Sequence, residues 1–378
     1  MVLPSDTPFR YEEPISPDEL VNRDQEIETL LERALAGRNT RLVAPRRYGK
    51  TSLLRRVLRD GRRRKLVGVY VDFYGVLSPA DVATRIDLAY GESLDGRLRS
   101  WFAGVRQTLH PVGRVSAGPA SVEVGADPAG PVDNGRALLE RLRTPHRLAQ
   151  KHGRQVLVVF DEFQAVLAAD AQIDAVFRSE IQHHGDLVAY IFAGSQPGMM
   201  RELFGDRRRP FFDQAAPLAL KPLPADALAD EIARRFERSS RDCSAVLEQL
   251  LKLAAGHPQR AMQLAAHLWA HTPEHETADS DTWRAALATV GQEVGEGFRA
   301  RWDHMPSTQR RALSALAAGD PPFGSVARER HGTSKGATSS ALRRLADDGE
   351  AAEDQHGAWR LIDPLFTRWV RSGRRWPE

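Results

Sequence analysis

The segment RLVAPRRYGKTSLL, which begins at Arg41, contains residue types that could hold a chain of phosphates. A short segment that ends in the apolar residues Leu42, Val43 and Ala44 leads into a loop that ends at Gly49, Lys50 and Thr51, and a helical pattern follows. Gly49 would let successive backbone N–H groups turn toward an anion, and Lys50 would place a positive charge on the β- and γ-phosphates. The Thr51 hydroxyl would bind Mg²⁺, and the N-terminal dipole of the following helix would favour the anion.

The loop departs from the usual Walker A pattern at one position. Ala44 stands where the first glycine is usual, and alanine is the least disruptive replacement because its side chain is a single methyl group. The strand–loop–helix context that this motif requires is present in the sequence. We therefore expect ATP to bind here, through Pro45, Arg46, Arg47, Tyr48, Gly49, Lys50, Thr51 and Ser52.

A second apolar run, 156–160, ends in two acidic residues, Asp161 and Glu162. The pattern is typical of a Walker B strand, in which Asp161 would hold Mg²⁺ and Glu162 would act as a general base on the attacking water. The alternative is a buried strand that happens to end in two surface acids. Because the phosphate loop lies upstream, the pair favours an ATPase that converts ATP and water to ADP and phosphate.

Two further positions could complete such a site. The next apolar run, 187–194, ends at Ser195, which could contact the γ-phosphate or the water, with Gln196 as the alternative and a simple strand-end turn as the other interpretation. An arginine cluster precedes the last expected core strand, a position from which a subunit can reach the nucleotide of its neighbour in a homo-oligomer. The sequence does not choose among its members, and a solvated surface cluster is the alternative: Arg207, Arg208 and Arg209.

Length and composition indicate an ordinary globular protein. The 378 residues are enough for about two to three domains. The formal charge of +3 permits a nucleic-acid partner without requiring one. No run of about 18 apolar residues is present, the N-terminal segment lacks an apolar signal region, and Cys243 is the only cysteine. We therefore expect a cytoplasmic chain with no membrane partner and no cysteine-based zinc cluster.

Apolar runs separated by helical patterns predict a parallel sheet that is covered on both faces by helices. After Pro224 the strand signals stop and helical patterns continue. A segment rich in Gly, Pro and Val, 112–135, interrupts the expected core as a β-hairpin or a loop insertion. The predicted division is an N-terminal arm at 1–19, an α/β core at 20–222, a helical lid at 223–300 and a winged helix-turn-helix at 301–378.

The last segment shows three helical patterns and then a two-stranded pattern between Ala351 and Leu361. We expect Ala337, Ala341, Leu342 and Leu345 on the core side of its third helix. The outward face would then carry short polar and basic groups suited to phosphates and base edges, namely Lys335, Thr338, Ser339 and Arg343. Acidic residues before and on the expected wing oppose contact with a phosphate backbone, so double-stranded DNA and a protein both stay open as partners.

Taken together, the motifs resemble the archaeal-type ATPases of the AAA+/STAND group of P-loop proteins. The resemblance covers about residues 9–372 and rests on LVNRDQEIETL, APRRYGKTSLL, VVFDEFQAVL, FAGSQPGMM, GHPQRAMQLAAHLW and LIDPLFTRWV. It implies an AAA+-like α/β P-loop core, an α-helical lid and a C-terminal winged helix. It also implies that Val21, Asn22 and Arg23 line an adenine pocket, and that His257 and Pro258 of the lid sense the phosphates. Arg260 departs from the spacing of the family's sensor arginine.

The family resemblance implies that ATP is hydrolysed slowly and serves as a conformational switch. The resulting hypothesis is a switch ATPase that uses ATP and Mg²⁺, forms a homo-oligomer and engages double-stranded DNA through its winged helix. The alternative is a nucleotide-regulated scaffold, or a partner of an effector protein such as a nuclease, toxin or defence system, in which the winged helix binds protein. A transcription regulator with a degenerate ATPase site is a third possibility, but the intact Glu162 argues against it.

Overall fold

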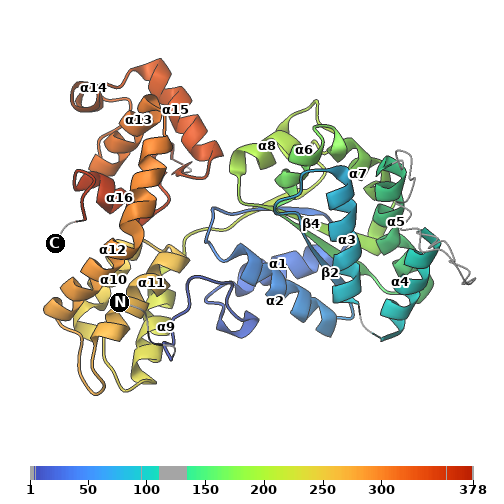
Figure 1. The fold of residues 1–378 in the computed structure, drawn as a ribbon, viewed down its shortest axis with the longest axis horizontal. Coiled ribbons are helices and arrows are strands. Elements are labelled where there is room, and N and C mark those ends of the chain that lie inside the picture. The colour runs from blue at the N-terminus through green and yellow to red at the C-terminus, as the bar shows by residue number, and fades with distance from the viewer. Residues whose placement is uncertain (1–3, 5, 95, 110–133, 355, 377–378) are drawn as a thin grey trace, which may run out of the picture.

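A computed structural model describes residues 4, 6–94, 96–109, 134–354 and 356–376. Figure 1 shows an α/β core beside a column of helices that contains the lid and the winged helix. The N-terminal arm lies between these two bodies and the chain ends on the winged helix, on the side away from the core (Figure 1).

The core is built on five parallel strands in the order β2-β3-β4-β1-β5. Because the strands are parallel, their carboxyl ends share one edge of the sheet, where Asp72 is paired with Asp161 and Val43 with Gly194. The strands are β1 (Thr40–Val43), β2 (Val67–Asp72), β3 (Val156–Asp161), β4 (Val188–Gly194) and β5 (Ala216–Ala219). The expected parallel sheet is confirmed.

Successive residues of β3 pack on opposite faces of the sheet. Leu157 and Val159 belong to an apolar cluster with α1 (Asp24–Leu35) and α2 (Lys50–Arg63). The side chains of Val158 and Phe160 belong to the cluster on the other face. That face is covered by α3 (Pro79–Ser93), α5 (Asn134–His152) and α7 (Ile173–Ile181). Burial of both faces explains why β3 and β4 are continuously apolar in sequence.

The remaining core elements are short or lie at the edges of the sheet. Two helices, α3 and α4 (Gly96–Leu109), follow β2. The insertion expected at 112–135 lies outside the described residues except for its last two positions, which begin α5. The other core elements are α6 (Val166–Ala169), α8 (Pro197–Gly205) and the 3₁₀ turns η2 (Phe163–Ala165) and η3 (Gly185–Leu187).

The lid contains four helices, and the N-terminal arm packs on them. Phe9 of the arm is buried against Phe236, with 5.5 Å between ring centroids, and Arg235 donates a 2.7 Å hydrogen bond to the Pro8 carbonyl. Left-handed residues at Ala255 and Gly256 separate the second and third lid helices. The elements are η1 (Pro17–Glu19), α9 (Ala225–Glu237), α10 (Ser244–Ala254), α11 (Pro258–His271) and α12 (Ser280–His304).

The C-terminal segment has the expected helix–helix–helix–wing order, and its two strands form an antiparallel pair. The helix α12 runs through the predicted boundary at 300/301, so one helix belongs to both the lid and the winged helix. The elements are α13 (Ser307–Ala318), α14 (Ser325–His331), α15 (Lys335–Asp347), β6 (Ala351–Glu353), β7 (Trp359–Leu361) and α16 (Pro364–Arg371). Within the described residues, no helix is both long enough and apolar enough to cross a membrane.

Candidate phosphate-binding site

The loop between β1 and α2 is held at both ends, by a hydrogen bond to β4 at its start and by the first turn of α2 at its end. Ala44 is buried and its N–H donates to the Gly194 carbonyl at 3.3 Å, which ties the loop to the end of β4. Gly49 precedes the first turn of α2 with a φ of 78°. A Cβ at this position would meet nothing within 4 Å, so the left-handed backbone, rather than crowding, is what favours glycine here. Arg47 is also left-handed, and backbone of this kind forms concavities for anions.

Residues of the two expected motifs meet at the carboxyl edge of the sheet. The Lys50 ammonium lies 2.5 Å from Asp161 Oδ1 and also donates to the Glu162 carboxylate. The Thr51 hydroxyl donates to Asp161 Oδ2 at 3.2 Å. A hydroxyl and a carboxylate oxygen are ligands that Mg²⁺ accepts, so this pair fits the ion. Among the described residues no group of three or more His, Cys, Asp or Glu could hold a metal, so Mg²⁺ here would need oxygens from phosphate and water.

Tyr70 belongs to this site although the sequence did not single it out. It lies on β2, next to β3, and its hydroxyl donates to Asp161 Oδ2 at 2.6 Å. Burial, and then the charge of Asp161, raise the pKa of Tyr70, so the hydroxyl stays protonated and keeps donating at neutral pH. The sequence feature that could have identified Tyr70 is its polar aromatic side chain in an otherwise apolar strand.

The Glu162 carboxylate is held by donors from three residues, Lys50, Gln164 and Ser195. The backbone of Glu162 is in the left-handed conformation, with a φ of 50°. Its Oε2 accepts from the Ser195 hydroxyl at 2.7 Å and from the Gln164 amide at 2.6 Å, while Lys50 donates to Oε1. Burial alone would raise the pKa of Glu162, but Lys50 and these hydrogen bonds hold it below the usual value. The carboxylate is therefore ionised at neutral pH.

The structure thus places Ser195, rather than the side chain of Gln196, on Glu162. Gln196 is half-buried, and its backbone carbonyl accepts from the Met200 N–H at the start of α8. Gln164 was not singled out by the sequence, although it stands two positions after Glu162. Its amide oxygen also leaves no room for a side chain at Gly194, where a Cβ would lie 2.5 Å away from it.

A pocket with an empty volume of about 430 Å³ lies beside the loop. Five of its lining residues were expected from the sequence: Val21, Arg23, Tyr48, Gly49 and Pro258. The others come from the arm, from α9 and α11 and from the chain between β5 and α9: Arg10, Ile15, Glu19, Leu20, Leu223, Arg235 and Met262. Asn22 is exposed and is not part of the lining.

Two expected residues of this region have internal partners. Arg23 is buried, and its guanidinium donates to Glu26 and to the Lys221 carbonyl, both at 2.8 Å. His257 precedes α11, accepts from the Arg260 N–H at 3.3 Å and packs edge-on against Tyr48 at 4.9 Å. Burial lowers the pKa of His257 to about 4, and nearby arginines add to this shift while Asp363 opposes it. The ring is therefore neutral at pH 7. Pro258 occupies the first turn, as expected.

The three clustered arginines differ in their partners. Arg209 is engaged with Glu202 and donates to the Ala171 carbonyl at 2.9 Å. Arg208 pairs with Asp206 at 2.8 Å. Arg207 is exposed and makes no hydrogen bond or ion pair with any residue of the described ranges. Of the three, Arg207 therefore has the guanidinium that is available to another molecule.

The winged helix docks on the core next to Ser195. Arg201 of α8 forms a 2.8 Å ion pair with Asp347 at the end of α15. A Cβ at Gly198 would lie 2.4 Å from the Asp347 Cβ, so the close approach requires glycine. Beyond α15, a Cβ at Gly349 would lie 3.5 Å from the Ser195 carbonyl oxygen. The helices α8 and α15 lie side by side in Figure 1.

A buried ionic network joins the lid to the winged helix. Arg260 of α11 donates to both oxygens of Asp363, at 3.1 Å and 2.7 Å. Arg301 of α12 lies 3.4 Å from the same carboxylate and also pairs with Glu350. Burial would raise the pKa of Asp363, but Arg260 and Arg301 lower it to about 2. Arg260, whose spacing departs from the family pattern, thus has a structural partner.

The outward face of α15 differs from expectation at one residue. Lys335 and Arg343 are exposed and Ser339 is half-buried. Thr338 is only 3% exposed, so its prediction as a nucleic-acid contact is wrong. The reason is helical phase: Thr338 lies three, four and seven positions before Ala341, Leu342 and Leu345, which form the buried stripe. Ala337, expected inside, is exposed instead.

No protein-family model and no curated protein matches the sequence. Among solved structures, the chain is similar to the Aeropyrum pernix ORC2 protein in its ADPNP–ADP complexes, with a TM-score of 0.55, 15% identity and 96% of each chain covered. The ADP form of that protein gives a TM-score of 0.50 at 16% identity, again over 96% of each chain. The Aeropyrum pernix ORC1 protein in complex with DNA gives a TM-score of 0.48, at 18% identity over 94% of this chain and 93% of that one. The expected fold, an AAA+-like P-loop core followed by a helical lid and a winged helix, is confirmed by the topology and by the ORC2 similarity.

Proposed function

We propose that this chain is a switch ATPase of the AAA+/STAND type, which binds ATP with Mg²⁺ and hydrolyses it slowly. The observation that carries the proposal is the meeting of Lys50, Thr51, Asp161, Glu162 and Ser195 at one edge of the sheet. A cation, two oxygen ligands for Mg²⁺ and a positioned carboxylate are the groups that phosphoryl transfer to water requires. We expect the chain to act in the cytoplasm.

Each residue has a role that its contacts support. Lys50, which now lies between two carboxylates, would exchange them for the β- and γ-phosphates. Thr51 and Asp161 would hold Mg²⁺, which supplies charge neutralisation on the phosphates, and Tyr70 would keep Asp161 in place. Glu162, ionised and oriented by Ser195, would accept a proton from the attacking water.

The pocket beside the loop would take the adenine. Its lining includes Val21 and Arg23 of the core and Pro258 of the lid. Because arm, core and lid all contribute to its walls, a bound base would contact all three. His257 packs on Tyr48 and would bring the start of α11 to the phosphate loop.

The test is ATP hydrolysis and nucleotide binding by Glu162→Gln and Lys50→Ala. Loss of the general base should lower hydrolysis about 10²- to 10⁴-fold and leave ATP binding intact. Loss of the ammonium should weaken ATP binding. Equal hydrolysis by wild type and Glu162→Gln would refute the assigned base, and failure of the wild type to bind ATP would refute the proposal.

We further propose that the protein forms a homo-oligomer in which Arg207 of one copy reaches the nucleotide of the next. The exposed, unpaired guanidinium of Arg207 supports this role, since Arg209 is engaged by Glu202. We also propose that the winged helix engages double-stranded DNA, with Lys335, Ser339 and Arg343 as contacts. Lys335 and Arg343 are exposed, and Asp347, one of the acids that opposed DNA binding, is paired with Arg201.

A second candidate function is a nucleotide-regulated scaffold whose winged helix binds protein, such as a nuclease, toxin or defence effector. The observation that favours it is the docking of the winged helix on its own core through Asp347 and Gly349, which is a protein contact. Duplex binding that weakens steeply with salt would favour the DNA partner, and absence of duplex binding would favour the scaffold.

A further inference from the structure

A second concave site lies on the winged helix, away from the ATPase edge. It has an empty volume of about 660 Å³. The end of α12, α13, the end of α14 and the C-terminal segment contribute its lining, which consists of Trp302, Ser307, Arg310, Arg311, Ser314, His331 and Arg374. We call it the arginine pocket. Its members come from segments up to 72 positions apart in the sequence, so no local sequence motif predicted it.

The arginine pocket contains three guanidinium groups and no carboxylate in its lining. Their contacts are neutral: Arg310 donates to the Met305 carbonyl at 2.8 Å, Arg311 donates to the Gly332 carbonyl at 3.2 Å, and Arg374 lies 5.5 Å from the Trp302 ring centroid. Within the described parts of the chain none of the three forms an ion pair. Each guanidinium has five N–H donors, so most donors remain available after these contacts.

This charge balance differs from that of other arginines in the chain. Arg301 and Arg260, which are also near α12, are both neutralised by carboxylates. Three cations around one hollow repel one another unless an anion lies between them. Asp320, which is not part of the lining, already pairs with His331 at 3.0 Å.

The chemistry of the lining favours phosphate. Guanidinium groups donate two parallel hydrogen bonds to phosphate oxygens, and several can share one group. Ser307 is the first residue of α13, a twelve-residue helix, so backbone N–H groups and the positive end of the helix dipole also lie at the pocket. The Ser307 and Ser314 hydroxyls add two further donors.

We propose that the arginine pocket binds a phosphate of a nucleic-acid backbone; this inference rests on the proposed DNA engagement of the winged helix. His331 of the pocket stands four positions before Lys335, the first residue of α15, so the two basic surfaces adjoin along the chain. The C-terminal end of α15 is held by α8, whereas the C-terminal segment that carries Arg374 packs against α12 on the side away from the core (Figure 1). The arginine pocket can therefore hold a backbone while the winged helix stays docked, and it positions the duplex without reading its bases.

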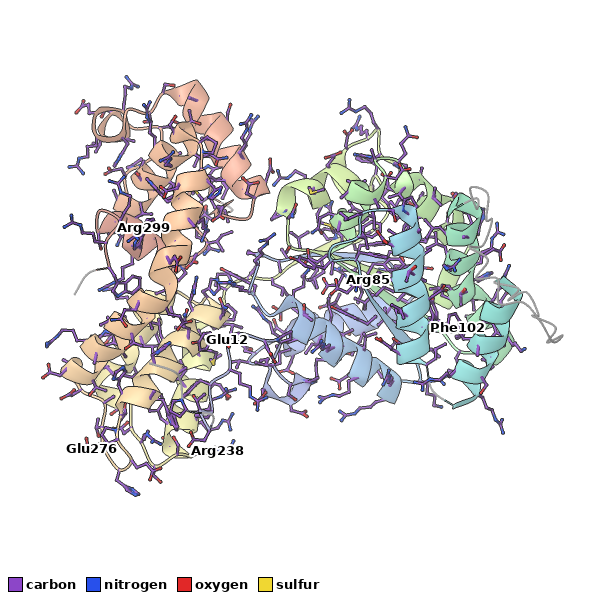
Figure 2. The ribbon with its side chains drawn as sticks, viewed as in Figure 1. Glu12, Arg85, Phe102, Arg238, Glu276 and Arg299 are labelled. Atoms are coloured by element: carbon purple, nitrogen blue, oxygen red, sulfur yellow. The ribbon has the colours of Figure 1, made fainter. Side chains whose placement is uncertain are left out.

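The test compares Arg311→Gln/Arg374→Gln with a control that also removes two positive charges, Arg238→Gln/Lys252→Gln. Both control residues are exposed and lie on the lid, and Figure 2 shows Arg238 at the end of the lid farthest from the winged helix. Arg310 is left intact because it supports the end of α12 through the Met305 carbonyl. Binding of a short duplex is measured by fluorescence anisotropy across a salt series, and binding of inorganic phosphate alone by calorimetry.

We expect the double variant to lower the slope of log affinity against log salt by about 1, since the pocket holds one phosphate and each lost phosphate contact removes about 0.9. Duplex affinity should fall at least about tenfold at moderate salt, and the control should keep the wild-type slope. An unchanged slope in the double variant would overturn the proposal. Wild type that binds inorganic phosphate at this pocket but no duplex would also overturn it, in favour of a free anion. ATP hydrolysis without DNA should be equal in the wild type, the double variant and the control variant. The ATPase proposal is therefore judged separately, by Glu162→Gln.

Discussion

Asp363→Asn isolates the charge that holds the lid and the winged helix together. Asp363 pairs with Arg260 and Arg301, and its Oδ1 also accepts the N–H groups of Leu365 and Phe366 at the start of α16, at 3.1 Å and 3.2 Å. Asparagine caps helices about as well as aspartate. The substitution therefore removes the negative charge, keeps the cap and leaves the buried Arg260 and the half-buried Arg301 without their shared carboxylate.

The expected loss of stability can be bracketed from the structure. The pKa of Asp363 is about 2 in the folded chain, against an ordinary value of 3.8. A difference of this size corresponds to about 2 kcal/mol of stability at neutral pH. Removing one partner of a buried ion pair typically costs about 3–5 kcal/mol, because the other charge stays buried. We expect Asp363→Asn to lower the free energy of unfolding by about 2–5 kcal/mol.

The pH dependence follows from the sign of the shift. Because the pKa of Asp363 is lower in the folded chain, its charge contributes stability fully above the unfolded pKa of 3.8. That contribution is lost as the pH falls toward 2. The stability difference between wild type and Asp363→Asn should therefore be constant from about pH 5 to 8 and should shrink below about pH 4.

Urea unfolding followed by tryptophan fluorescence is a suitable assay, since six of the seven tryptophans lie in the lid and the winged helix. The matched control is Asp279→Asn, because Asp279 caps α12 through the N–H groups of Asp281 and Thr282 and has no arginine partner. The control should leave stability nearly unchanged. If Asp363→Asn lost no more stability than the control, or if its deficit persisted unchanged at pH 3, the ionic network would not hold these domains together.

Two further predictions concern the phosphate site. Ser195→Ala removes a donor that lowers the pKa of Glu162. We therefore expect slower hydrolysis, intact ATP binding and an acid limb of the pH–rate profile that is shifted to higher pH. An unchanged profile would exclude Ser195 as a positioning residue. Arg207→Ala should lower the ATPase rate about 10²-fold or more at protein concentrations that favour association. Arg209→Ala should instead lower thermal stability, because the ion pair with Glu202 is lost. Equal rates for wild type and Arg207→Ala at all concentrations would show that Arg207 does not reach the nucleotide of a neighbouring copy.

The parts of the site that the sequence predicted are those that the topology brings together. In a parallel sheet the residue after each strand lies at the carboxyl edge, so two motifs about a hundred residues apart converge there without further information. Lys50, Asp161 and Ser195 meet for this reason. The continuous apolar character of β3 and β4 was enough to place both strands inside the sheet.

The residues that were missed depend on docking or on helical phase. Tyr70 reaches Asp161 because β2 pairs with β3, and the sequence of neither strand specifies which strands are neighbours. Ile15 joins the pocket because the arm folds back on the lid, a contact between distant segments. Thr338 was assigned to the surface because it is polar, but its spacing to Leu342 and Leu345 places it on the buried stripe.

The lid and the winged helix share one apolar core, and this decides where the molecule can bend. A single cluster contains Phe9 of the arm, Leu264 of the lid and Leu365 of the winged helix, whereas the sheet has its own clusters on both faces. The helix α12 runs through both C-terminal parts, and Asp363 adds a buried ionic contact between them. The contacts that α15 and the turn after it make with the core are polar or small, through Asp347 and Gly349, but Ile362, beyond β7, is buried in the apolar cluster of α1 and α2. Separating the two C-terminal parts would expose apolar surface and an unpaired charge, whereas parting α15 from α8 would mainly break an exposed ion pair, which costs about 1 kcal/mol or less. The contact that α15 makes beside Ser195 should therefore open more readily than the contact between the lid and the winged helix.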